Sequence, residues 1–339
     1  MMKSKKSLLV CLLLSVVMLT GCTQYMKTDN VAVKNPDTGQ SVVSNILCKT
    51  SETEETYKKI VDEKKKEYKE LLDNEDITKK EYKQKVKDLE KQYDLEKLPY
   101  CKNLGVLSGG YEGLWTTFFV KPLAWILVKT GNFVKNYGLA VIIITFLIRL
   151  IMYPVTRSTA MQSENLKKIQ PELERLEKKY RGKENDQQAM MIKSQEMMML
   201  YKQYNINPFS SCLFSLIQIP LFFAFFEALN RLPIIFEGNL GPLTLGMTPG
   251  VALANGKYYY LIIVVLVVAT TYFSFKLNSG ASMSKEQADQ MKMMMNVMIV
   301  MISISSFTVA TSIALYWITN SAFTIFQNLI VKRGKKKNA

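Results

Sequence analysis

A single charged residue interrupts an otherwise apolar stretch of this chain. Residues 141–154 read VIIITFLIRLIMYP, and Arg149 carries the only charge among them. A guanidinium stays protonated in proteins, so this residue would keep its charge inside a lipid bilayer. Intramembrane charges normally face a bundle interior or a water-filled cavity, where they mark functional sites. Thr145 lies one helical turn earlier on the same helix face, so both residues are candidates for a site.

Two other interpretations of Arg149 are open. Its side chain can extend to the inner membrane surface, since Pro154 follows shortly after it. It can also pair with a buried acid, but the only acid in the apolar stretches, Glu227, lies near the outer end of its segment, whereas Arg149 lies in the inner half. A charge without an acidic partner needs water, which favours a wet groove open to the cytoplasm.

The second chemical signal is a cysteine near the N-terminus. Residues 1–21 have a basic start, a short apolar run and a small-residue end, which is typical of a signal peptide. The ending LTGC resembles a bacterial lipobox, in which Cys22 receives palmitate and becomes the mature N-terminus. The alternative is an uncleaved signal anchor. Either interpretation places residue 23 onward outside the cell and the protein in a bacterial plasma membrane.

The composition argues against an enzyme. The chain has no His, its five Cys contain no CxxC pair, and no phosphate-binding glycine loop or GxSxG motif is present. We therefore predict no catalytic residue, no cofactor and no metal site. The net charge of +15 would suit a nucleic-acid partner in a soluble protein, but here basic segments alternate with long apolar stretches. This pattern predicts a membrane protein without a DNA partner.

The apolar stretches predict an all-α membrane protein with five transmembrane helices. These are expected at 137–155, 208–229, 258–277, 293–310 and 312–331, with an extracellular loop at 230–257 and a cytoplasmic loop at 278–292. Residues 110–135 are also apolar but contain Pro122 and are interrupted by Glu112, Lys121 and Lys129, which favours an interfacial helix on the outer surface. If residues 110–135 are not counted as a span, the basic segments 156–207 and 332–339 both fall in the cytoplasm, as the positive-inside rule requires.

Two helical hairpins are predicted outside the membrane. Residues 49–101 follow an extracellular linker (22–48) and repeat apolar residues at helical spacing; Thr78 and Glu81 are spaced as a capping box that opens the second helix. Cys48 and Cys101 lie just beyond the two ends, so they could form a disulfide or be two unrelated thiols.

The second hairpin is the cytoplasmic segment 156–207, in which Asp186 can cap the second helix. That helix is rich in methionine. Such residues can bind varied apolar partners, but packing between the two helices is the interpretation we favour for most of them.

Four stretches resemble the YidC/Oxa/Alb family of membrane protein insertases. They are YGLAVIIITFLIRLIMYPVTRSTAMQS (137–163), LKKIQPELERLEKKY (166–180), YNINPFSSCLFSLIQIPLFFAFFEAL (204–229) and LYWITNSAFTIFQNLIVKR (315–333). The resemblance covers about residues 110–335, and the lipidated start resembles the Gram-positive branch; the 49–101 hairpin is not a family hallmark. It implies an insertase and chaperone whose five helices enclose a hydrophilic groove, open to the cytoplasm and to lipid and closed on the outside.

The resemblance also implies roles for individual residues. Arg149 would attract acidic residues in the external tail of a substrate, and Trp317 matches a groove aromatic, although it could equally be a packing residue. Ser274 stands where the family commonly has a groove glutamine, and Gln218 could line the groove or join two helices. The basic tail is expected to contact ribosomes or anionic lipids through Lys332, Arg333, Lys335, Lys336 and Lys337. Implied partners are nascent membrane proteins, the Sec translocon, the ribosome and membrane lipids.

Two other functions compete with insertion. A small transporter or channel would be expected to show internal repeats, and none is visible. A lipid-anchored scaffold could use the 49–101 hairpin to bind an extracellular partner. Replacing Arg149 separates these functions, because a scaffold should not respond to the loss of that charge.

Overall fold

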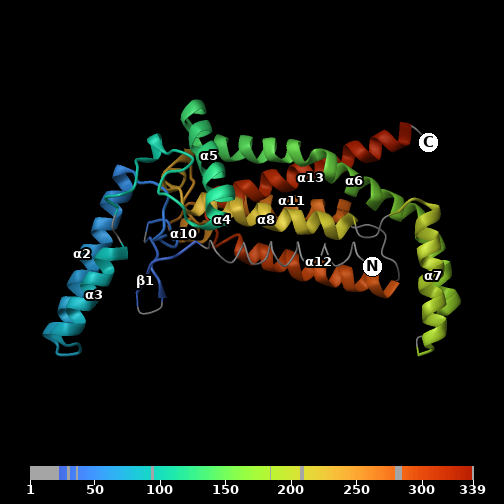
Figure 1. Ribbon diagram of the computed structural model, residues 1–339, viewed down its shortest axis with the longest axis horizontal. Coiled ribbons are helices and arrows are strands. Elements are labelled where there is room, and N and C mark those ends of the chain that lie inside the picture. Colours follow the sequence, from blue (N-terminus) through green and yellow to red (C-terminus); the bar gives the residue numbers. More distant parts are fainter. Residues whose placement is uncertain are drawn as a thin grey trace. The chain divides into compact units, whose positions relative to one another are not determined.

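The chain is mostly helical (Figure 1). It divides into two compact units. The computed structural model describes residues 23–28, 31–35, 37–92, 95–183, 185–206, 210–278 and 285–337; the expected signal peptide and Cys22 lie outside them. Unit 1 comprises Met1–Ile144, Pro220–Tyr258 and Thr308–Ile313. Unit 2 comprises Thr145–Ile219, Tyr259–Phe307 and Ala314–Ala339.

The first unit contains short strands, a long helical hairpin and a bent helical segment. Its hairpin consists of α2 (Ser51–Asp73) and α3 (Lys79–Gln92). The bent segment consists of α4 (Gly113–Trp115), a π-helical turn (Thr116–Val120) and α5 (Lys121–Val134). The smaller elements are β1 (Lys27–Thr28), β2 (Val31–Ala32), α9 (Pro233–Phe236), β3 (Asn239–Leu240), β4 (Leu243–Thr244) and α10 (Pro249–Ala254), with β1–β2 and β3–β4 pairing antiparallel.

Long helices make up the second unit. They are α6 (Tyr137–Tyr180), α7 (Gln187–Gln203), α8 (Ser210–Asn230), α11 (Leu261–Asn278), α12 (Lys285–Ser305) and α13 (Thr311–Lys337), of which α6, α8 and α13 are divided between the units. The expected spans are thus helical where the structure describes them, with one exception. Helix α12 begins at Lys285, inside the expected loop at 278–292, and ends at Ser305, so residues 306–310 of the expected fourth span are not helical. The basic residues of the tail extend α13, and Lys332 and Arg333 are exposed.

Some of these helices are candidates for crossing a membrane by their length and apolar composition. Among the described residues, the helical stretch Tyr258–Leu277 is long and apolar enough to do so. A second candidate joins Tyr137–Ile151 to Tyr153–Tyr180 across a bend of 62°, and Lys292–Ser305 is apolar but shorter. The bend precedes Pro154, whose ring prevents a regular helical hydrogen bond and kinks the chain.

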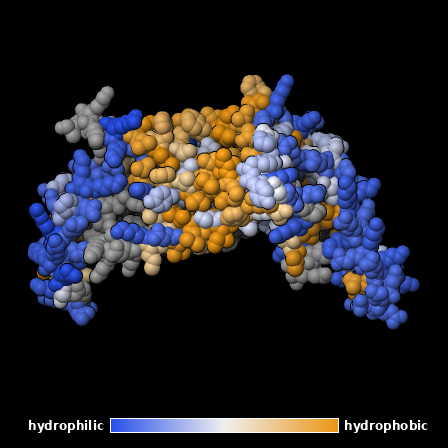
Figure 2. All heavy atoms as spheres, turned by 180° about the vertical axis from the view of Figure 1, so that it is seen from behind, coloured by the Kyte–Doolittle hydropathy of each residue, from blue (hydrophilic) through white to orange (hydrophobic). Residues whose placement is uncertain are grey.

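Surface hydropathy separates the hairpin from the apolar helices. Figure 2 shows hydrophobic residues gathered over the apolar helices, whereas the surface of the α2–α3 hairpin is hydrophilic. On α12, Met293, Val297, Val300 and Met301 are all mostly exposed. Exposed apolar surfaces of this kind are unusual in water and are expected where lipid is the solvent.

The segment that we expected to be a polar linker instead contributes to a packed core. Met26, Val42, Val43 and Ile46 are buried in a cluster with apolar residues of α2 and α3. The hydroxyl of Tyr57 in α2 donates a hydrogen bond of 2.6 Å to the carbonyl of Val43. The described residues of 23–48 therefore form part of the core of the α2–α3 hairpin, because their apolar side chains cover the inner face of α2.

Both helix caps predicted from the sequence are confirmed. The backbone N–H of Glu81 donates to the hydroxyl of Thr78, while the carboxylate of Glu81 accepts from the N–H of Thr78, which is the reciprocal pattern of a capping box. Asp186 accepts hydrogen bonds from the N–H groups of Gln188 and Ala189 at the start of α7. Local sequence determines these bonds, which is why spacing alone located them.

The methionine-rich helix departs from the packing that we favoured. Met197 packs on a small core formed by α6 and α7. Met191, Met198 and Met199 are instead exposed, so the packing prediction is wrong for these three. Only one face of α7 packs against α6, and Tyr201, Met197 and Leu200 occupy that face.

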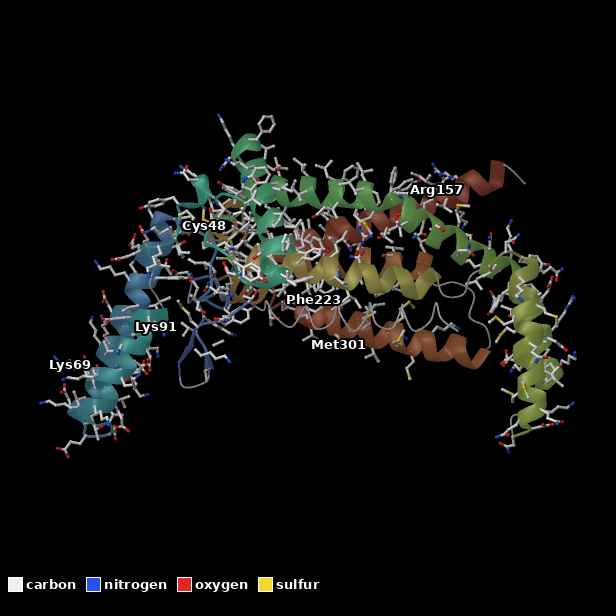
Figure 3. All side chains as sticks on the ribbon, viewed as in Figure 1. Cys48, Lys69, Lys91, Arg157, Phe223 and Met301 are labelled. Atoms are coloured by element: carbon white, nitrogen blue, oxygen red, sulfur yellow. A yellow bond between two sulfur atoms is a disulfide. The ribbon has the colours of Figure 1, made fainter. Side chains whose placement is uncertain are left out.

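A disulfide closes the base of the α2–α3 hairpin. Cys48 and Cys101 are bonded (Figure 3), and both are buried. Two backbone hydrogen bonds flank the disulfide: the N–H of Lys49 donates to the carbonyl of Pro99, and the N–H of Cys101 donates to the carbonyl of Lys49. Of the two alternatives left open by the sequence, the structure therefore contains the disulfide.

A glycine sets the close approach at the corner between α5 and α6. A Cβ atom added to Gly131 would lie 2.1 Å from the ring of Tyr137. We expect Gly131→Ala to destabilise the protein by about 1–3 kcal/mol, because the ring must leave its position. Thermal unfolding in detergent checks this, and Gly131→Ala combined with Tyr137→Leu should recover most of the loss. An unchanged midpoint for the single variant would contradict the packing described here.

Candidate functional site

Arg149 is buried on α6 and binds an amide. Only 4% of the residue is exposed, and its Nε donates a hydrogen bond to the Oδ1 of Asn320 on α13. No described Asp or Glu lies within ion-pair distance of it. The amide satisfies one of the five guanidinium donors but supplies no negative charge. The positive charge of Arg149 is therefore not balanced by a described acid.

A second hydrogen bond joins the same two helices two turns further along. The hydroxyl of Thr156 on α6 contacts the Oε1 of Gln327 on α13 at 2.9 Å, and both residues are buried. Arg149 and Thr156 are seven residues apart, as are Asn320 and Gln327, so each pair lies on one face of its helix. Because both numbers increase together, α6 and α13 run in the same direction along this seam.

Unit 2 contains further buried polar residues on α6, α13 and α11. Thr145 is almost fully buried one turn before Arg149, and Tyr316 is buried one turn before Asn320. Ser321 on α13 and Thr271 on α11 are buried as well, and the hydroxyl of Thr271 has no hydrogen-bond partner among the described residues. Unsatisfied hydroxyls are costly in an apolar medium, so this composition suits a region that water or a polar guest can enter.

The other predicted site residues lie on three different helices. Ser274 on α11 is almost buried, while Trp317 on α13 and Gln218 on α8 are intermediate in exposure. Arg149 donates its hydrogen bond to Asn320 and to none of these three residues. Cys22 lies outside the described residues, as do the side chains of Lys335, Lys336 and Lys337.

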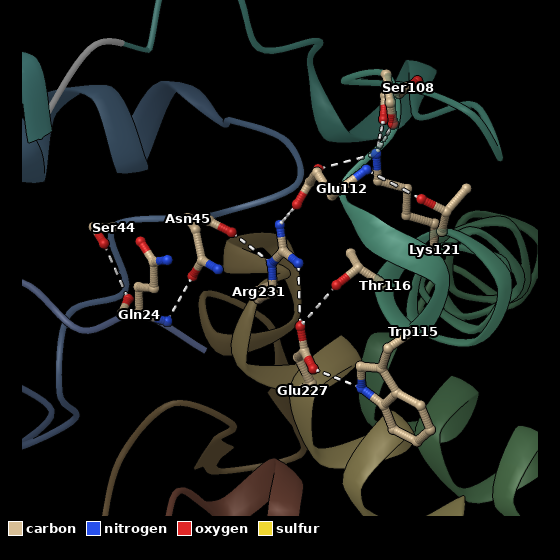
Figure 4. Close-up of polar contacts among 12 residues, drawn as sticks. Gln24, Ser44, Asn45, Ser108, Glu112, Trp115, Thr116, Lys121, Glu227 and Arg231 are labelled. Carbon is tan, nitrogen blue, oxygen red and sulfur yellow. Dashed lines mark hydrogen bonds and ion pairs between the residues drawn. The ribbon is translucent and has the colours of Figure 1, made fainter. Parts of the chain in front are cut away.

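Glu227, the one acid in the apolar stretches, has partners within its own unit. Its carboxylate accepts hydrogen bonds from Trp115 at 3.0 Å and from Arg231 at 3.2 Å (Figure 4). The expectation that Glu227 does not pair with Arg149 agrees with these contacts.

Sequence reasoning missed three of the residues that make these contacts. Asn320 and Thr156 are polar groups inside apolar helices, and that property alone could have selected them. Arg231 follows Glu227 by four residues, the spacing at which opposite charges meet on a helix. None of these signals identifies the partner on another helix, which requires the fold.

Comparison with known proteins places the chain in a family. Residues 129–338 match the model of the family described as 60Kd inner membrane protein, a range that leaves out the α2–α3 hairpin. The membrane protein insertase YidC of Oceanobacillus iheyensis is 32% identical over 229 residues, which cover 66% of this chain and 85% of that protein. The YidC of Alkalihalophilus pseudofirmus is 32% identical over 224 residues, or 64% of this chain and 81% of the relative.

A solved structure is also similar. A crystal structure of an active YidC insertase, with its first transmembrane domain resolved, matches with a TM-score of 0.46 and 24% identity. The match covers 65% of this chain and 48% of the other, so this chain spans about half the length of that protein. The family match includes Arg149, Asn320 and the whole α6–α13 seam. The chain belongs to the 60Kd inner membrane protein family, the YidC/Oxa family of membrane protein insertases.

Proposed function

We propose that this insertase uses the unbalanced charge of Arg149 to draw acidic residues of a substrate tail into a hydrophilic groove. The observation that carries the proposal is the buried guanidinium, which has an amide partner and no described acid. Thr145, Ser274, Gln218 and Trp317 are proposed to line the same groove. No covalent chemistry is needed, since the work is moving a polar tail past an apolar barrier.

The physical advantage lies in lowering the cost of burying the tail. An isolated carboxylate in hydrocarbon is very unfavourable, and this cost opposes transfer of the external tail. Opposite charges about 4 Å apart attract by about 4 kcal/mol at an effective dielectric constant of about 20, and desolvation offsets part of that gain. A resident acid beside Arg149 would cancel this attraction, whereas Asn320 holds the guanidinium in place and leaves its charge for the guest.

The proposed topology has five spans, with the N-terminus outside and the C-terminus inside. The parallel direction of α6 and α13 supports it, because the first and fifth spans of such a protein cross the membrane in the same sense. Lipidation at Cys22 would anchor the outer end. The basic end of α13 would then face the cytoplasm, where clustered lysines attract anionic lipids and ribosomal RNA.

Proposed partners follow from the same topology. Nascent membrane proteins are the substrates, and the Sec translocon and the ribosome are proposed to deliver some of them. The exposed methionines of α7 offer an adaptable apolar surface to arriving segments on the cytoplasmic side.

Complementation tests the proposal. An insertase-depleted bacterium receives the wild type, Arg149→Lys or Arg149→Ala, and insertion of a single-span client with an acidic external tail is measured. We expect about a tenfold or larger loss for Arg149→Ala, because the attraction is removed, and partial activity for Arg149→Lys, which keeps the charge. Arg157→Ala is the matched control, since Arg157 is an exposed cation on the same helix (Figure 3).

Two results would count against the proposal. Full activity of Arg149→Ala at normal protein level would show that the groove charge is dispensable. Equal loss in Arg157→Ala would show that any positive charge on α6 matters and that burial of Arg149 is irrelevant.

A further inference from the structure

Unit 1 contains a buried ion network that the proposed insertion step does not use. It consists of Glu227, Arg231, Glu112 and Lys121, joined by three ion pairs (Figure 4). Arg231 and Lys121 are each 2% exposed at their side chains, and Glu227 is almost as buried. Two cations and two anions balance one another. Burying these charged groups costs desolvation free energy, which offsets much of the attraction between them. The network is therefore better explained by the residues it positions than by a contribution to the stability of the fold.

Arg231 joins three parts of the chain. Its guanidinium donates to Glu227, to Glu112 and to the carbonyl of Asn45 in the segment before the hairpin. Lys121 closes the network from the other side, since its ammonium contacts Glu112 at 2.9 Å and the carbonyl of Ser108 at 2.8 Å.

The two cations also hold Glu112 in its charged form. Burial alone would raise the pKa of Glu112, but the hydrogen bonds and charges of Arg231 and Lys121 together hold it below its ordinary value. The carboxylate therefore stays ionised around neutral pH and can bridge both cations.

The network contacts one side of the α4–α5 segment. Trp115 and Thr116 both bind the carboxylate of Glu227, and Lys121 follows on the same buried side. The π-helical turn between Thr116 and Val120 inserts extra backbone, which brings Val120 and Lys121 round to the side of Trp115. Polar bonds at both ends of this turn leave the segment little freedom to rotate about its axis.

The side of the segment away from the network is exposed and apolar. Leu114 is 52% exposed, Phe118 64% and Phe119 48%, and Phe133 near the end of α5 is 88% exposed. This surface leads directly into the apolar start of α6, because α5 ends at Val134 and α6 begins at Tyr137. An aromatic face that is continuous with a membrane-spanning helix fits the headgroup region of a bilayer.

We propose that the ion network of Glu227, Arg231, Glu112 and Lys121 fixes the rotation of the 113–134 segment about its helix axis. Its aromatic face then rests on the outer surface of the plasma membrane. Arg231 is the positioning residue in this account, because it alone contacts both carboxylates and the chain before the hairpin. The inference rests on the proposed function only through its five-span topology, which leaves residues 110–135 outside the spans, on the outer surface as the sequence predicts. Loss of Arg231 leaves two partly or fully buried carboxylates facing each other, and the segment must turn or move to rehydrate them.

The test reads the lipid contact of one side chain. Full-length protein carrying Phe118→Cys and Cys212→Ser is labelled with a nitrobenzoxadiazole probe and reconstituted in phosphatidylglycerol–phosphatidylethanolamine vesicles. Parent protein without the introduced cysteine gives the background. Nitroxide lipids should quench the fluorescence of the probe at residue 118 strongly when Arg231 is present, and at least about twofold less in Arg231→Gln. Quenching of the same probe by aqueous iodide should increase in Arg231→Gln. Arg231→Lys should be intermediate, because an ammonium lacks the planar fork that reaches three partners.

Controls separate positioning from general unfolding. Lys129→Gln removes an exposed cation from the same helix and should leave quenching unchanged. A second probe at Glu63→Cys, on the exposed face of α2, should stay accessible to iodide in every variant. If Arg231→Gln does not accumulate, Arg231→Lys and Glu227→Gln are measured by the same readout.

Three results would overturn the inference. Unchanged quenching at residue 118 in Arg231→Gln would show that the network does not set the rotation. Weak nitroxide quenching in the protein with intact Arg231 would show that the aromatic face does not lie in lipid. An equal change at both probes, or in Lys129→Gln, would show a general loss of fold. Failure of the groove charge would instead appear as insertion that does not depend on Arg149, with this quenching pattern intact.

Discussion

Replacing both Cys48 and Cys101 by serine should destabilise the part of the protein that contains the α2–α3 hairpin by about 4 kcal/mol. The disulfide joins residues with a sequence separation of 53, which lowers the conformational entropy of the unfolded chain. Removing this constraint should therefore lower the free energy of unfolding by about 4 kcal/mol. The hairpin core is small, since it is formed by α2, α3 and the short segment before them. A small core depends strongly on such a cross-link. Reduction should therefore expose the hairpin to protease well below the temperature at which the oxidised protein is cut.

The double serine variant is the right comparison, because it leaves no single thiol to mispair. Its membrane part should remain intact, so the protein should still be found in the membrane fraction. Equal protease resistance of the oxidised and serine forms would show that the core of the hairpin holds without the bond.

Replacing Glu227 by alanine should have a comparable effect, about 3–5 kcal/mol, because it leaves the buried guanidinium of Arg231 short of a partner. The indole N–H of Trp115 loses its acceptor at the same time. Glu227→Gln keeps an acceptor for Trp115 and similar volume, so it should cost less than the alanine variant. Thermal unfolding midpoints in detergent measure both effects.

A matched control is the exposed pair of Lys59 and Glu55 on α2. Surface pairs contribute little, so Glu55→Ala should change the midpoint only slightly. If Glu227→Ala were as mild as Glu55→Ala, the network would be tolerant of an unpaired buried charge, and the argument from its geometry would fail.

Local features of this fold could be read from the sequence, because they depend on residues close together in the chain. The cap at Thr78 and Glu81 and the cap at Asp186 each involve residues within three positions of one another. The helical nature of the apolar stretches follows from backbone hydrogen bonding in lipid. The resemblance to a known family added the function, which no spacing of residues would have supplied.

The missed features are long-range. Asn320 lies 171 positions from Arg149, and Glu112 lies 119 positions from Arg231. Nothing local distinguishes Asn320 from another amide in an apolar helix. The same holds for residues 23–48, whose scattered apolar side chains acquire a role only when α2 provides a surface to cover. The sequence suggested that Arg149 lacks an acid, but only the fold revealed an amide in that place.

The most direct test of the central claim varies the charge of the substrate rather than of the insertase. Clients with identical spans and with neutral, singly acidic or multiply acidic external tails are presented to the wild type, Arg149→Lys and Arg149→Ala. If the charge of Arg149 attracts the tail, insertion by the wild type should increase with each carboxylate, the increase should be smaller for Arg149→Lys, and it should be absent for Arg149→Ala. The same dependence on tail charge in the wild type and in Arg149→Ala would contradict the account, because the attraction would then come from elsewhere.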